Sequence, residues 1–573
     1  MLKVKIVSSQ EKIFIDNNID DFSSFESVSA LSSEVLNFQF IYVDEGDTEL
    51  PVRPICKLTL EGELAPYATV RDVRSVPVER PTLPGIVDSN YLRMTPGVYP
   101  DVLTPLRYGG KVAVGKDKLR SLWIEVRIPE GYSGESTLNI GLGLESGASG
   151  DTAVLLFDGT PIASASLEIN VIDAALPEAK LLFTQWFYAD CLAGYYRVPV
   201  WSERHWEIVE SFAKVAIDRG RNMLYTPLLT PALNVVEPYE RTPCQLVSVE
   251  VVDGKYFFDF TNVDRWVDMC DRIGAKYLEI AHFYDQHKAL HSAKVYGVVD
   301  GEQREIFGWQ TASDDPEYVR FLREMISAFL EHMRARGDDK RCVFHIADEP
   351  NIDDLERFLK IKNNIADLLD GYVIMDALSD IEFYNNGAVT EPVPVTTHAM
   401  PFIEAGVPDL WVYYACNQVV DYSNCYVAMP SWRTRSIGMQ LYKYNVKGFL
   451  HWGFNFYNNR CSGDVINPYL DLSGEDWVPA GDTFAVYPGT DGTPLESIRI
   501  MTLEEAIQDV RAMCLAEKYY SHEEVVRTME EALGDEITFE RCARSADEML
   551  RVRAAVNGMI EAAVLSGKDG KCK

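Results

Sequence analysis

The sequence contains no C-x-x-C pair, no uncharged apolar run that approaches 18 residues, and far fewer basic than acidic residues. Its 11 cysteines are odd in number and lack metal-ligand spacing, which argues against a disulfide framework and against zinc ribbons. The lack of a long apolar run predicts that the chain does not insert into a membrane. Lysine and arginine total 54 against 87 for aspartate and glutamate, so the net charge of −33 would repel nucleic acid and anionic lipid.

Signals for cofactors and for secretion are also absent. The sequence has no P-loop, no G-x-G-x-x-G and no G-x-S-x-G, so we expect neither a nucleotide cofactor nor the common serine hydrolase arrangement. The first 20 residues alternate apolar with polar residues instead of forming the apolar core of a secretory signal, so we expect a cytoplasmic protein. The acidity fits either solubility or a preference for a neutral or cationic ligand, and it does not name the substrate.

The first part of the chain has a β-strand pattern. With 573 residues, 47% of them hydrophobic and 25% charged, the chain is globular and long enough for two or three domains. From 1 to 175 its apolar residues recur with a period of two, in short runs between turn-rich joints. The runs are NFQFIYV (37–43), ICKLTL (55–60), SLWIEVRIP (121–129), STLNIGLGL (136–144), TAVLLFDG (152–159) and ASLEINVI (165–172). They predict an N-terminal antiparallel β-sandwich domain over 1–175.

A different rhythm follows, in which short β-like runs alternate with helix-length amphipathic segments. We predict eight strands, at 180–187, 222–229, 275–283, 342–347, 371–377, 394–399, 410–416 and 446–454, with helices such as 203–220, 316–337 and 353–371 between them. Each of these helices ends in a glycine suited to a C-terminal cap. The pattern predicts an α/β fold, a catalytic (β/α)8 TIM barrel over 180–490, with a C-terminal helical extension over 495–573. An open doubly wound sheet is the alternative.

Two segments interrupt the barrel pattern. Two alternating runs flank Asp253-Gly254, which predicts a hairpin insertion within 234–260. Residues 284–314 are predicted to be a long polar loop, and loops of that length in compact domains are commonly functional.

Two adjacent carboxylates terminate the predicted fourth strand, as Asp348-Glu349-Pro350. Reactive groups in such barrels stand at the carboxyl ends of strands. Adjacent side chains point to opposite faces of a regular strand, but both can reach the barrel mouth where the backbone turns. Close carboxylates disfavour simultaneous ionisation, which raises the pKa of one and makes it a candidate general acid. The competing interpretation is that Asp348 caps a helix beginning near Asn351 and that Glu349 is a solvated first-turn anion.

Aromatic and amide side chains recur near the other predicted strand ends. They are Gln185, Trp186, Tyr188, His282, Tyr284, Tyr413, Tyr414, Asn417, Trp452, Asn455 and Tyr457. Sugars present an apolar C–H face for stacking and a hydroxyl rim for hydrogen bonds, which such residues suit. Any single aromatic is more often a core residue than a ligand contact, so the prediction of a carbohydrate pocket depends on their repeated position.

Three histidines, His282, His287 and His291, have a spacing that a zinc site could use, but no H-E-x-x-H helix accompanies them. We therefore predict no metal site. His345 lies within the predicted fourth strand and fits a buried core histidine better than a ligand.

Several blocks, in this order, resemble domain-of-unknown-function family 4091, which is related to glycoside hydrolase family 123. The blocks are PDVLTPL (100–106), LWIEVRIPEGYSGESTLNI (122–140), LEINVIDAALPE (167–178), FHIADEP (344–350), LWVYYACNQ (410–418), FLHWGFNFYN (449–458) and VYPGTDGTPLESIRIMTLEEAIQD (486–509). The resemblance implies a β-sandwich, a catalytic barrel and a C-terminal extension.

The resemblance also implies cleavage of β-linked N-acetylgalactosaminides with help from the substrate. Glu349 would protonate the leaving oxygen, and Asp348 would orient the 2-acetamido group as its carbonyl oxygen attacks the anomeric carbon to form an oxazolinium with overall retention. Tyr413 or Tyr414 would hold the acetamide oxygen, and Trp452 would form the floor of the sugar site. A nucleophile attached to the sugar supplies proximity, so a second carboxylate on the opposite face is not needed.

Two alternatives stay open. The chain could be a non-catalytic carbohydrate-binding or assembly protein, because fold does not guarantee chemistry. It could also be a conventional retaining glycosidase in which Glu349 works with a distant carboxylate such as Asp376 or Glu279. In each case the expected partner is a glycan or glycoconjugate, while the oligomeric state is not predicted.

Overall fold

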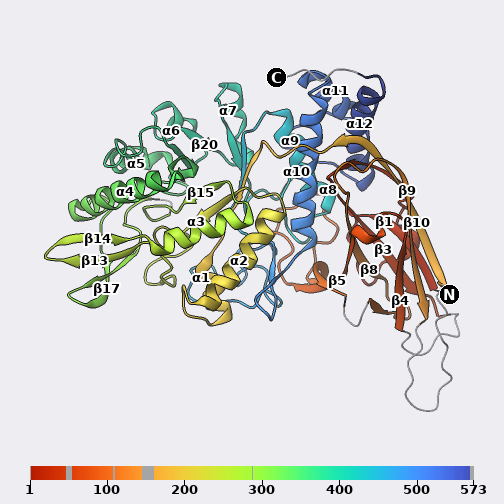
Figure 1. The fold of residues 1–573 in the computed structure, drawn as a ribbon, viewed down its shortest axis with the longest axis horizontal. Helices are drawn as coiled ribbons and strands as arrows, with labels where there is room; N and C mark the ends of the chain where they lie inside the picture. Colours follow the sequence, from red (N-terminus) through yellow and green to blue (C-terminus); the bar gives the residue numbers. More distant parts are fainter. Residues whose placement is uncertain (1, 47–54, 107–109, 145–160, 287, 568–573) are drawn as a thin grey trace, which may run out of the picture. The chain divides into compact units, whose positions relative to one another are not determined.

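The structure is a computed structural model, and it describes all residues except 1, 47–54, 107–109, 145–160, 287 and 568–573. By contact the chain divides into two compact units (Figure 1). We call Met1–Lys180, Val420–Lys443 and Leu495–Lys573 the sheet-and-helix unit, and Leu181–Val419 with Tyr444–Pro494 the barrel unit. The C-terminal helices thus group with the N-terminal strands, whereas the division predicted above follows chain order.

The sheet-and-helix unit is β-rich at its N-terminus, as predicted. One sheet has the order β1 (Leu2–Ser8), β3 (Val35–Asp44), β8 (Arg120–Arg127), β5 (Ala68–Val78) and β6 (Gly97–Pro105). The other has the order β2 (Ser27–Ser32), β10 (Ala163–Ala175), β9 (Gly134–Leu144), β4 (Ile55–Glu61) and β7 (Lys111–Ala113). All named pairings in these two sheets are antiparallel except β2 with β10, which is parallel. The short helices η1 (Ile19–Asp21) and η2 (Ala65–Tyr67) lie between strands.

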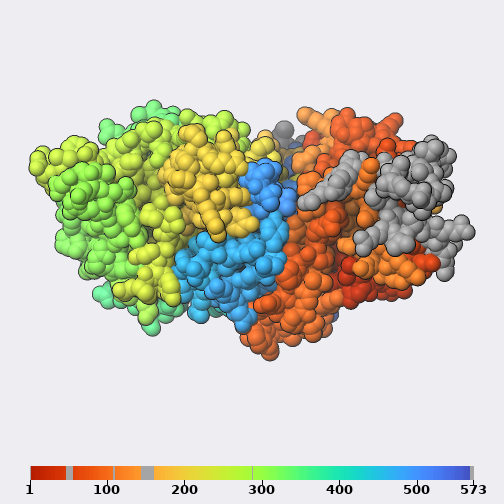
Figure 2. Space-filling model, turned by 90° about the horizontal axis from the view of Figure 1, so that it is seen from below, coloured from red at the N-terminus to blue at the C-terminus, as the bar shows by residue number. Residues whose placement is uncertain are grey.

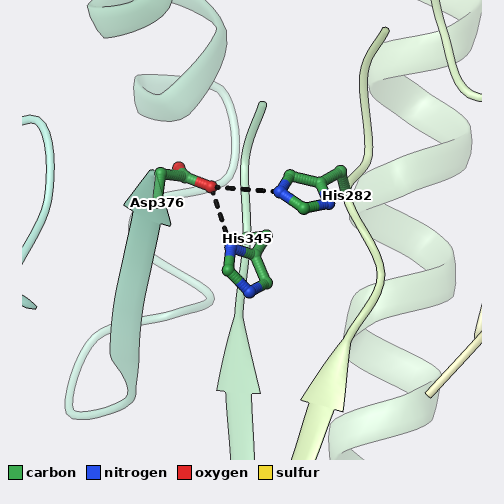
Figure 3. A group of neighbouring side chains, drawn as sticks. All are labelled: His282, His345 and Asp376. Atoms are coloured by element: carbon green, nitrogen blue, oxygen red, sulfur yellow. Dashed lines mark hydrogen bonds and ion pairs between the residues drawn. The ribbon is translucent and has the colours of Figure 1, made fainter. Parts of the chain in front are cut away.

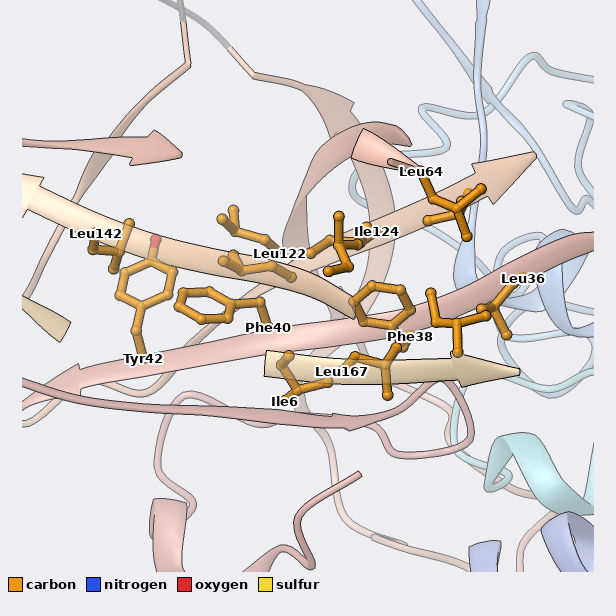
Figure 4. Packing of buried hydrophobic residues seen from close by; sticks show 14 of the residues in the cluster. Ile6, Leu36, Phe38, Phe40, Tyr42, Leu64, Leu122, Ile124, Leu142 and Leu167 are labelled. Atoms are coloured by element: carbon orange, nitrogen blue, oxygen red, sulfur yellow. The ribbon is translucent and has the colours of Figure 1, made fainter. Parts of the chain in front are cut away.

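Alternating side chains from both sheets enter one buried cluster (Figure 4). Phe38, Phe40 and Tyr42 recur at every second position of β3, so all three point to the same face of the strand. Leu142 of β9 and Leu167 of β10 contribute from the other sheet. The period-two pattern in the sequence therefore marks this core. One predicted run, 152–159, lies outside the described residues.

Helices complete the sheet-and-helix unit, and the C-terminal helices confirm the predicted extension. They are α8 (Ser431–Arg435), α9 (Ile437–Lys443), α10 (Ile498–Ala516), α11 (His522–Leu533) and α12 (Ala546–Leu565). Their apolar faces share a second buried cluster with Leu31 and Ile172 of the sheets. Among the helices that the structure describes, none combines the length and the apolarity that crossing a bilayer requires.

The barrel unit contains eight parallel strands that nearly close into a barrel. They are β11 (Leu182–Gln185), β12 (Met223–Thr226), β15 (Tyr277–Ile280), β18 (Cys342–Phe344), β19 (Val373–Ala377), β20 (Glu391–Val393), β21 (Trp411–Tyr413) and β22 (Gly448–His451). Their order is β20-β19-β18-β15-β12-β11-β22-β21. Just beyond β20, Val395 makes a parallel bridge to Tyr413 of β21, which joins the two ends of this order. The structure is therefore consistent with the predicted TIM barrel and not with an open sheet.

The predicted position of the sixth strand was wrong. We expected it at 394–399, but β20 ends at Val393 and Thr396–His398 form the short helix η5. Pairing with Met375–Ala377 selects Glu391–Val393 as the strand, although two prolines flank Val393. The β-branched residues that suggested a strand lie beyond its carboxyl end, where the chain already turns.

Helices of the barrel unit connect successive strands. They are α1 (Ala189–Tyr196), α2 (Glu203–Asp218), α3 (Thr261–Ile273), α4 (Pro316–Arg336), α5 (Leu355–Asn363), α6 (Ile381–Asn385) and α7 (Met400–Glu404), with the short helices η3 (Asp339–Arg341) and η4 (Ile352–Asp354). Gly337 ends α4 at φ +84°, as predicted, whereas the helix predicted at 353–371 ends already at Asn363. The exposed side of α1 and α2 is visible as the yellow surface in Figure 2.

The insertions form a four-stranded sheet in the order β14, β13, β16 and β17 (Figure 1). The predicted hairpin at Asp253-Gly254 is confirmed by β13 (Ser248–Val252) and β14 (Lys255–Asp259). The prediction of a long polar loop over 284–314 was wrong in part, because β16 (Val295–Val299) and β17 (Glu302–Phe307) form a second hairpin there. An Asp-Gly turn at 300–301, at φ +53° and +82°, is the signal that identifies it. After 455 the chain has only the two-residue strands β23 (Tyr487–Pro488) and β24 (Pro494–Leu495) before α10.

Removing one buried carboxylate should destabilise the sheet-and-helix unit strongly. Asp509, fully buried on α10, accepts hydrogen bonds from Arg435 at 2.7 and 2.8 Å and from Arg553 at 2.9 Å. Burial raises the pKa of Asp509, but the two guanidinium groups more than offset this and hold it below its ordinary value. Asp509→Asn would remove the carboxylate that both guanidinium groups share and leave Arg435 with the longer 3.5 Å contact to Glu505 and Arg553 with Glu34, so we expect unfolding in urea to show a loss of about 3–5 kcal/mol.

Arg527→Ala is the matched control, because the Arg527–Glu531 pair is 67% and 73% exposed. We expect a change within about 0.5 kcal/mol for this surface substitution. Equal losses in the two variants would contradict the importance of the buried network.

Candidate active site

A cavity of about 570 Å³ opens at the carboxyl ends of the barrel strands. It is lined by Trp186, Asn234, Gln286, Asp348, Glu349, Ala377, Val395, Thr397, His398, Tyr413, Ala415, Cys416, Asn417, Gln418, Leu450, Trp452 and Trp477. Most of these residues lie at or just beyond the carboxyl ends of six barrel strands, namely β11, β18, β19, β20, β21 and β22. The others belong to the segments that connect the strands. The cavity therefore occupies the end of the barrel where active sites of this fold lie.

A backbone turn brings the two neighbouring carboxyl groups to the same cavity. Glu349 has φ +48°, in the left-handed region that non-glycine residues rarely adopt. Its N–H donates to the Ala377 carbonyl at the end of β19, at 3.0 Å. A regular strand would point Asp348 and Glu349 to opposite faces, so this conformation is what allows both to line the cavity.

Asp348 is buried, with 2% of its surface exposed. Its Oδ2 accepts a hydrogen bond of 2.7 Å from Gln286 Nε2, while its buried Oδ1 has no hydrogen-bond partner among the described residues. Burial, and then the neighbouring Glu349, raise the pKa of Asp348 well above its ordinary value. The alternative helix-cap role is not observed, because Asn351, and not Asp348, is the N-cap residue of η4, and no side-chain hydrogen bond caps this helix.

Glu349 accepts a hydrogen bond of 2.5 Å from the Tyr413 hydroxyl. Burial, and then the charge of Glu349, raise the pKa of Tyr413 well above its ordinary value, so this phenol stays protonated and remains a donor. Tyr413 ends β21 and thereby fixes one oxygen of the Glu349 carboxyl group.

Three tryptophans form aromatic walls of the cavity, and their rings are held in place. Trp452 Nε1 donates to Asp482 Oδ2 at 2.8 Å, and its ring lies 5.5 Å from that of Trp477. Trp186 Nε1 donates to Glu279 Oε1 at 2.7 Å, and its ring stacks on Tyr225 with centroids 5.3 Å apart. Rings fixed in this way provide rigid apolar faces of the kind that sugars stack on.

A buried ionic network lies next to the carboxyl pair (Figure 3). His345 Nε2 lies 2.8 Å from Glu279 Oε1 and its Nδ1 lies 3.1 Å from Asp376 Oδ1. Burial lowers the pKa of His345, but the hydrogen bonds to Asp376 and Glu279 outweigh it and raise the pKa to about 9. Burial raises the pKa of Asp376 to about 6, against the opposing effect of His345.

His282 stacks on His345, with centroids 4.2 Å apart, and its Nδ1 lies 3.0 Å from the Tyr225 hydroxyl. Burial, and then the charge of His345, lower the pKa of His282 well below its ordinary value, so this ring is neutral.

Among the residues that the structure describes, His282, His345 and Asp376 form a group that could hold a metal ion, because their ligand atoms lie within 4.8 Å of one another (Figure 3). This group differs from His282, His287 and His291, the three histidines whose spacing in the sequence could suit a zinc site. His291 faces Asp285 at 3.5 Å, and His287 lies outside the described residues. A cation at the three-residue group would have to replace the proton that His345 Nδ1 shares with Asp376.

The predicted site residues divide into two groups. The residues that line the cavity are Asp348, Glu349, Trp186, Tyr413, Asn417 and Trp452. The residues that are buried and are not among the described residues lining it are Gln185, Tyr188, His282, Tyr284, Tyr414, Asn455 and Tyr457.

The second group makes contacts within the barrel. Gln185 Nε2 donates to the Gly453 carbonyl at 2.9 Å, and Asn455 bonds both the N–H and the carbonyl of Tyr188. Tyr414 packs edge-on against Phe449 and His451, with ring centroids 5.0 and 5.3 Å away. The sequence does not distinguish these residues from those that line the cavity, because both sets lie near predicted strand ends.

Sequence reasoning did not single out Gln286 or Trp477. Gln286 lies in the polar segment 284–314, and the length of that segment was the feature of the sequence that could have pointed to it. Trp477 lies in the irregular stretch after 455, where no periodicity predicts which side chain points inward.

A nearly closed parallel barrel, with paired carboxyl groups and aromatic walls at the carboxyl ends of its strands, has the features of a barrel glycoside hydrolase. The family model for the catalytic domain of glycoside hydrolase 123 matches residues 186–516, more than half of the chain. The chain belongs to glycoside hydrolase family 123, which confirms the resemblance noted in the sequence, and the protein is a glycosidase.

One solved structure supports the fold. A family 123 glycoside hydrolase from Clostridium perfringens, studied for the details of glycolipid glycan hydrolysis, has a TM-score of 0.71 and 15% identity over 99% of this chain and 98% of that chain. The endo-1,4-β-D-xylanase 10B of Clostridium thermocellum has a TM-score of 0.32 and 6% identity, covering 89% of this chain and 93% of that chain. No curated protein matches the chain.

The raised pKa of His345 makes stability depend on pH in a specific direction. Because the folded pKa of about 9 lies above the ordinary 6.5, the contribution is fully present below pH 6.5 and is lost as the pH rises through 9. We expect the stability advantage of the wild type over His345→Gln in urea unfolding to shrink by up to about 3 kcal/mol between pH 6 and pH 9.5. An advantage that stays constant or grows over this range would contradict a charged His345.

Proposed function

We propose that this glycosidase hydrolyses β-linked N-acetylhexosaminides, with N-acetylgalactosaminides preferred, by substrate-assisted catalysis with retention of configuration. The observation that carries the proposal is the pairing of Glu349 with Asp348 in one cavity, where Asp348 Oδ1 is a buried acceptor without a partner among the described residues. An acetamido N–H is a donor that would satisfy such an atom.

The adjacency of the two carboxyl groups favours a nucleophile carried by the substrate. Neighbouring residues that line the same part of a cavity are poorly placed to act on opposite faces of one sugar ring. The acetamide carbonyl oxygen, already attached at the adjacent ring carbon, can attack the anomeric carbon with the advantage of an intramolecular reaction.

Asp348 would orient the acetamide and stabilise the cation. As the carbonyl oxygen forms its bond to the anomeric carbon, positive charge develops at the acetamide nitrogen. Burial and the neighbouring Glu349 raise the pKa of Asp348, whereas the positive charge that develops at the acetamide nitrogen favours its ionised form, so the carboxylate accepts that N–H as the cation forms. The same burial that raises the pKa strengthens the interaction, because little water competes for the charge.

Glu349 would act as general acid and then as general base. Its proton passes to the glycosidic oxygen as the bond from that oxygen to the anomeric carbon breaks. In the second step Glu349 takes a proton from water, whose oxygen attacks the anomeric carbon and reopens the oxazolinium to the acetamide. Tyr413, which donates to Glu349 Oε1, would keep the carboxyl group oriented through both steps.

The conventional two-carboxylate alternative is less well supported. Glu279 and Asp376, the distant carboxylates considered for it, both bond to His345, are fully buried, and are not among the described residues lining the cavity.

Other residues of the cavity would contact the sugar. Trp452 and Trp477 would support the ring, and Tyr413, which lines the cavity, is a better candidate than Tyr414 for an acetamide contact. A glycan like the one named for the C. perfringens relative is the substrate class to test first.

The acetamido group should be required for turnover. We expect hydrolysis of a chromogenic β-N-acetylgalactosaminide and no comparable hydrolysis of the same aglycone on plain galactose, since galactose lacks the internal nucleophile. Initial rates measured by absorbance under identical conditions test this. Equal rates on the two substrates would eliminate acetamide participation.

The two carboxyl variants should respond differently to the leaving group. Glu349→Gln should lose about 10²- to 10⁴-fold in kcat/KM on a poor leaving group and recover much of it with an aglycone of low pKa, which needs no protonation. Asp348→Asn should lose about 10²- to 10³-fold with both aglycones, because acetamide orientation is needed in either case.

The matched pair is measured on one substrate series with aglycones of graded pKa. If both variants gave the same dependence on aglycone pKa, the division of roles between Asp348 and Glu349 would be wrong.

A further inference from the structure

The end of β19 holds the catalytic turn at two points, one on each side of Asp348. The Asp376 carboxylate accepts the backbone N–H of Ile346, with its Oδ1 and Oδ2 at 3.1 and 3.0 Å. The next residue, Ala377, accepts the N–H of Glu349 through its carbonyl at 3.0 Å. Asp348 lies between these two anchors, so its position depends on where β19 ends.

Asp376 is itself fixed by His345, and through it by Glu279, neither of which is among the described residues that line the cavity. His345 bonds Asp376 through Nδ1 and Glu279 through Nε2, at 3.1 and 2.8 Å (Figure 3). Glu279 in turn accepts the indole N–H of Trp186 at 2.7 Å and the hydroxyl of Thr184. His345, Glu279 and Asp376 are fully buried, and therefore no water competes for these bonds.

We propose that Asp376 is a positioning residue for the glycosidase reaction, acting through the backbone at Ile346 to hold Asp348 and Glu349 in their productive arrangement. The inference rests on the proposed function, since it assigns the residue that supports the proposed acid and the proposed acetamide-orienting group. Asp376 is not among the described residues that line the cavity, so its effect on the reaction is indirect.

The need for such a support follows from the conformation of the turn. A non-glycine residue in a sparsely populated backbone region is strained and persists only where its surroundings hold it. Glu349 is in such a conformation, at φ +48°. A shift of about 1 Å in a catalytic group can reduce the rate by about 10²-fold.

The amide variant Asp376→Asn separates positioning from packing. It keeps the size of the side chain and one acceptor oxygen, but its NH₂ group must face either the N–H of Ile346 or the N–H of His345. We expect a folded protein whose kcat on a β-N-acetylgalactosaminide falls about 10²-fold while KM changes less than threefold, and which an aglycone of low pKa does not rescue.

Glu391→Gln is the matched control. Glu391 is a buried carboxylate at the start of β20, where it accepts from Trp411 Nε1 at 2.8 Å and from Lys447 at 2.5 Å. It lies at the amino ends of the barrel strands, away from the cavity, so we expect destabilisation with an unchanged kcat. A purely structural role for Asp376 would make the two variants alike in kcat and in melting temperature.

Crystal structures of the wild type and Asp376→Asn provide a reading that does not require activity. We expect the variant to lose the 2.7 Å contact from Gln286 to Asp348 or the left-handed conformation of Glu349. An unchanged turn together with wild-type kcat would overturn the inference. If the wild type did not hydrolyse any β-N-acetylhexosaminide, the proposed function would fail, and the two structures would still decide whether Asp376 holds the turn.

If Asp376→Asn does not fold, His345→Gln takes its place, because it removes the group that fixes the Asp376 carboxylate. A zinc ion bound by the wild type in a 1:1 ratio, lost together with activity on chelation and absent from both variants, would also overturn the inference. In that case the His282, His345 and Asp376 group would act through a cation instead of a shared proton.

Discussion

The left-handed backbone at Glu349 is the constraint on which the site depends. Without it, two residues adjacent in sequence would point to opposite sides of the chain, as they do in a regular strand, and one carboxyl group would be lost from the cavity. With it, Asp348 and Glu349 line the same cavity. Their proximity and burial give the two carboxyl groups different properties. One carboxyl group, Asp348, strongly resists ionisation, while the other is held by a tyrosine hydroxyl. In the mechanism proposed above, where a group of the substrate is the nucleophile, both carboxyl groups act from one side of the sugar.

The barrel supports this turn through charge in addition to apolar packing. An imidazolium between two carboxylates is expensive to bury unless every member is paired, and here His345 is bonded on both ring nitrogens. The same network reaches Trp186, a wall of the cavity, through Glu279. One buried ionic group therefore connects the aromatic surface that would face the sugar with the backbone that carries the two carboxyl groups. This connection explains why polar residues occupy the barrel interior beneath the site.

Much of the architecture could be predicted from the sequence, because local periodicity reports it directly. Seven of the eight barrel strands and the Asp253-Gly254 hairpin lie where apolar alternation and turn residues indicate. The sixth strand was misplaced because pairing with β19, a long-range effect, selects Glu391–Val393 over the more β-like residues that follow. The second hairpin was missed although its Asp-Gly turn is visible, since the polar residues around it suggested a loop.

The carboxyl pair could be predicted because it directly follows the predicted strand 342–347, although β18 itself ends at Phe344. Its surroundings could not be predicted. Gln286 comes from a distant insertion, and only the folded chain brings it to 2.7 Å from Asp348. Strand-end aromatics and amides look alike in sequence, yet Trp452 lines the cavity while Asn455, three residues later, bonds the backbone of Tyr188. The direction of a side chain after a short strand depends on the turn, and no periodicity encodes that turn.

The most direct test of the account is a crystal structure with a thiazoline mimic of the oxazolinium bound. The account predicts the mimic in the cavity at the carboxyl ends of the strands, its ring nitrogen within about 3 Å of Asp348 Oδ1 and Glu349 next to the anomeric carbon. A mimic bound with its ring nitrogen away from Asp348, or Asp348 turned out of the cavity in the complex, would contradict it.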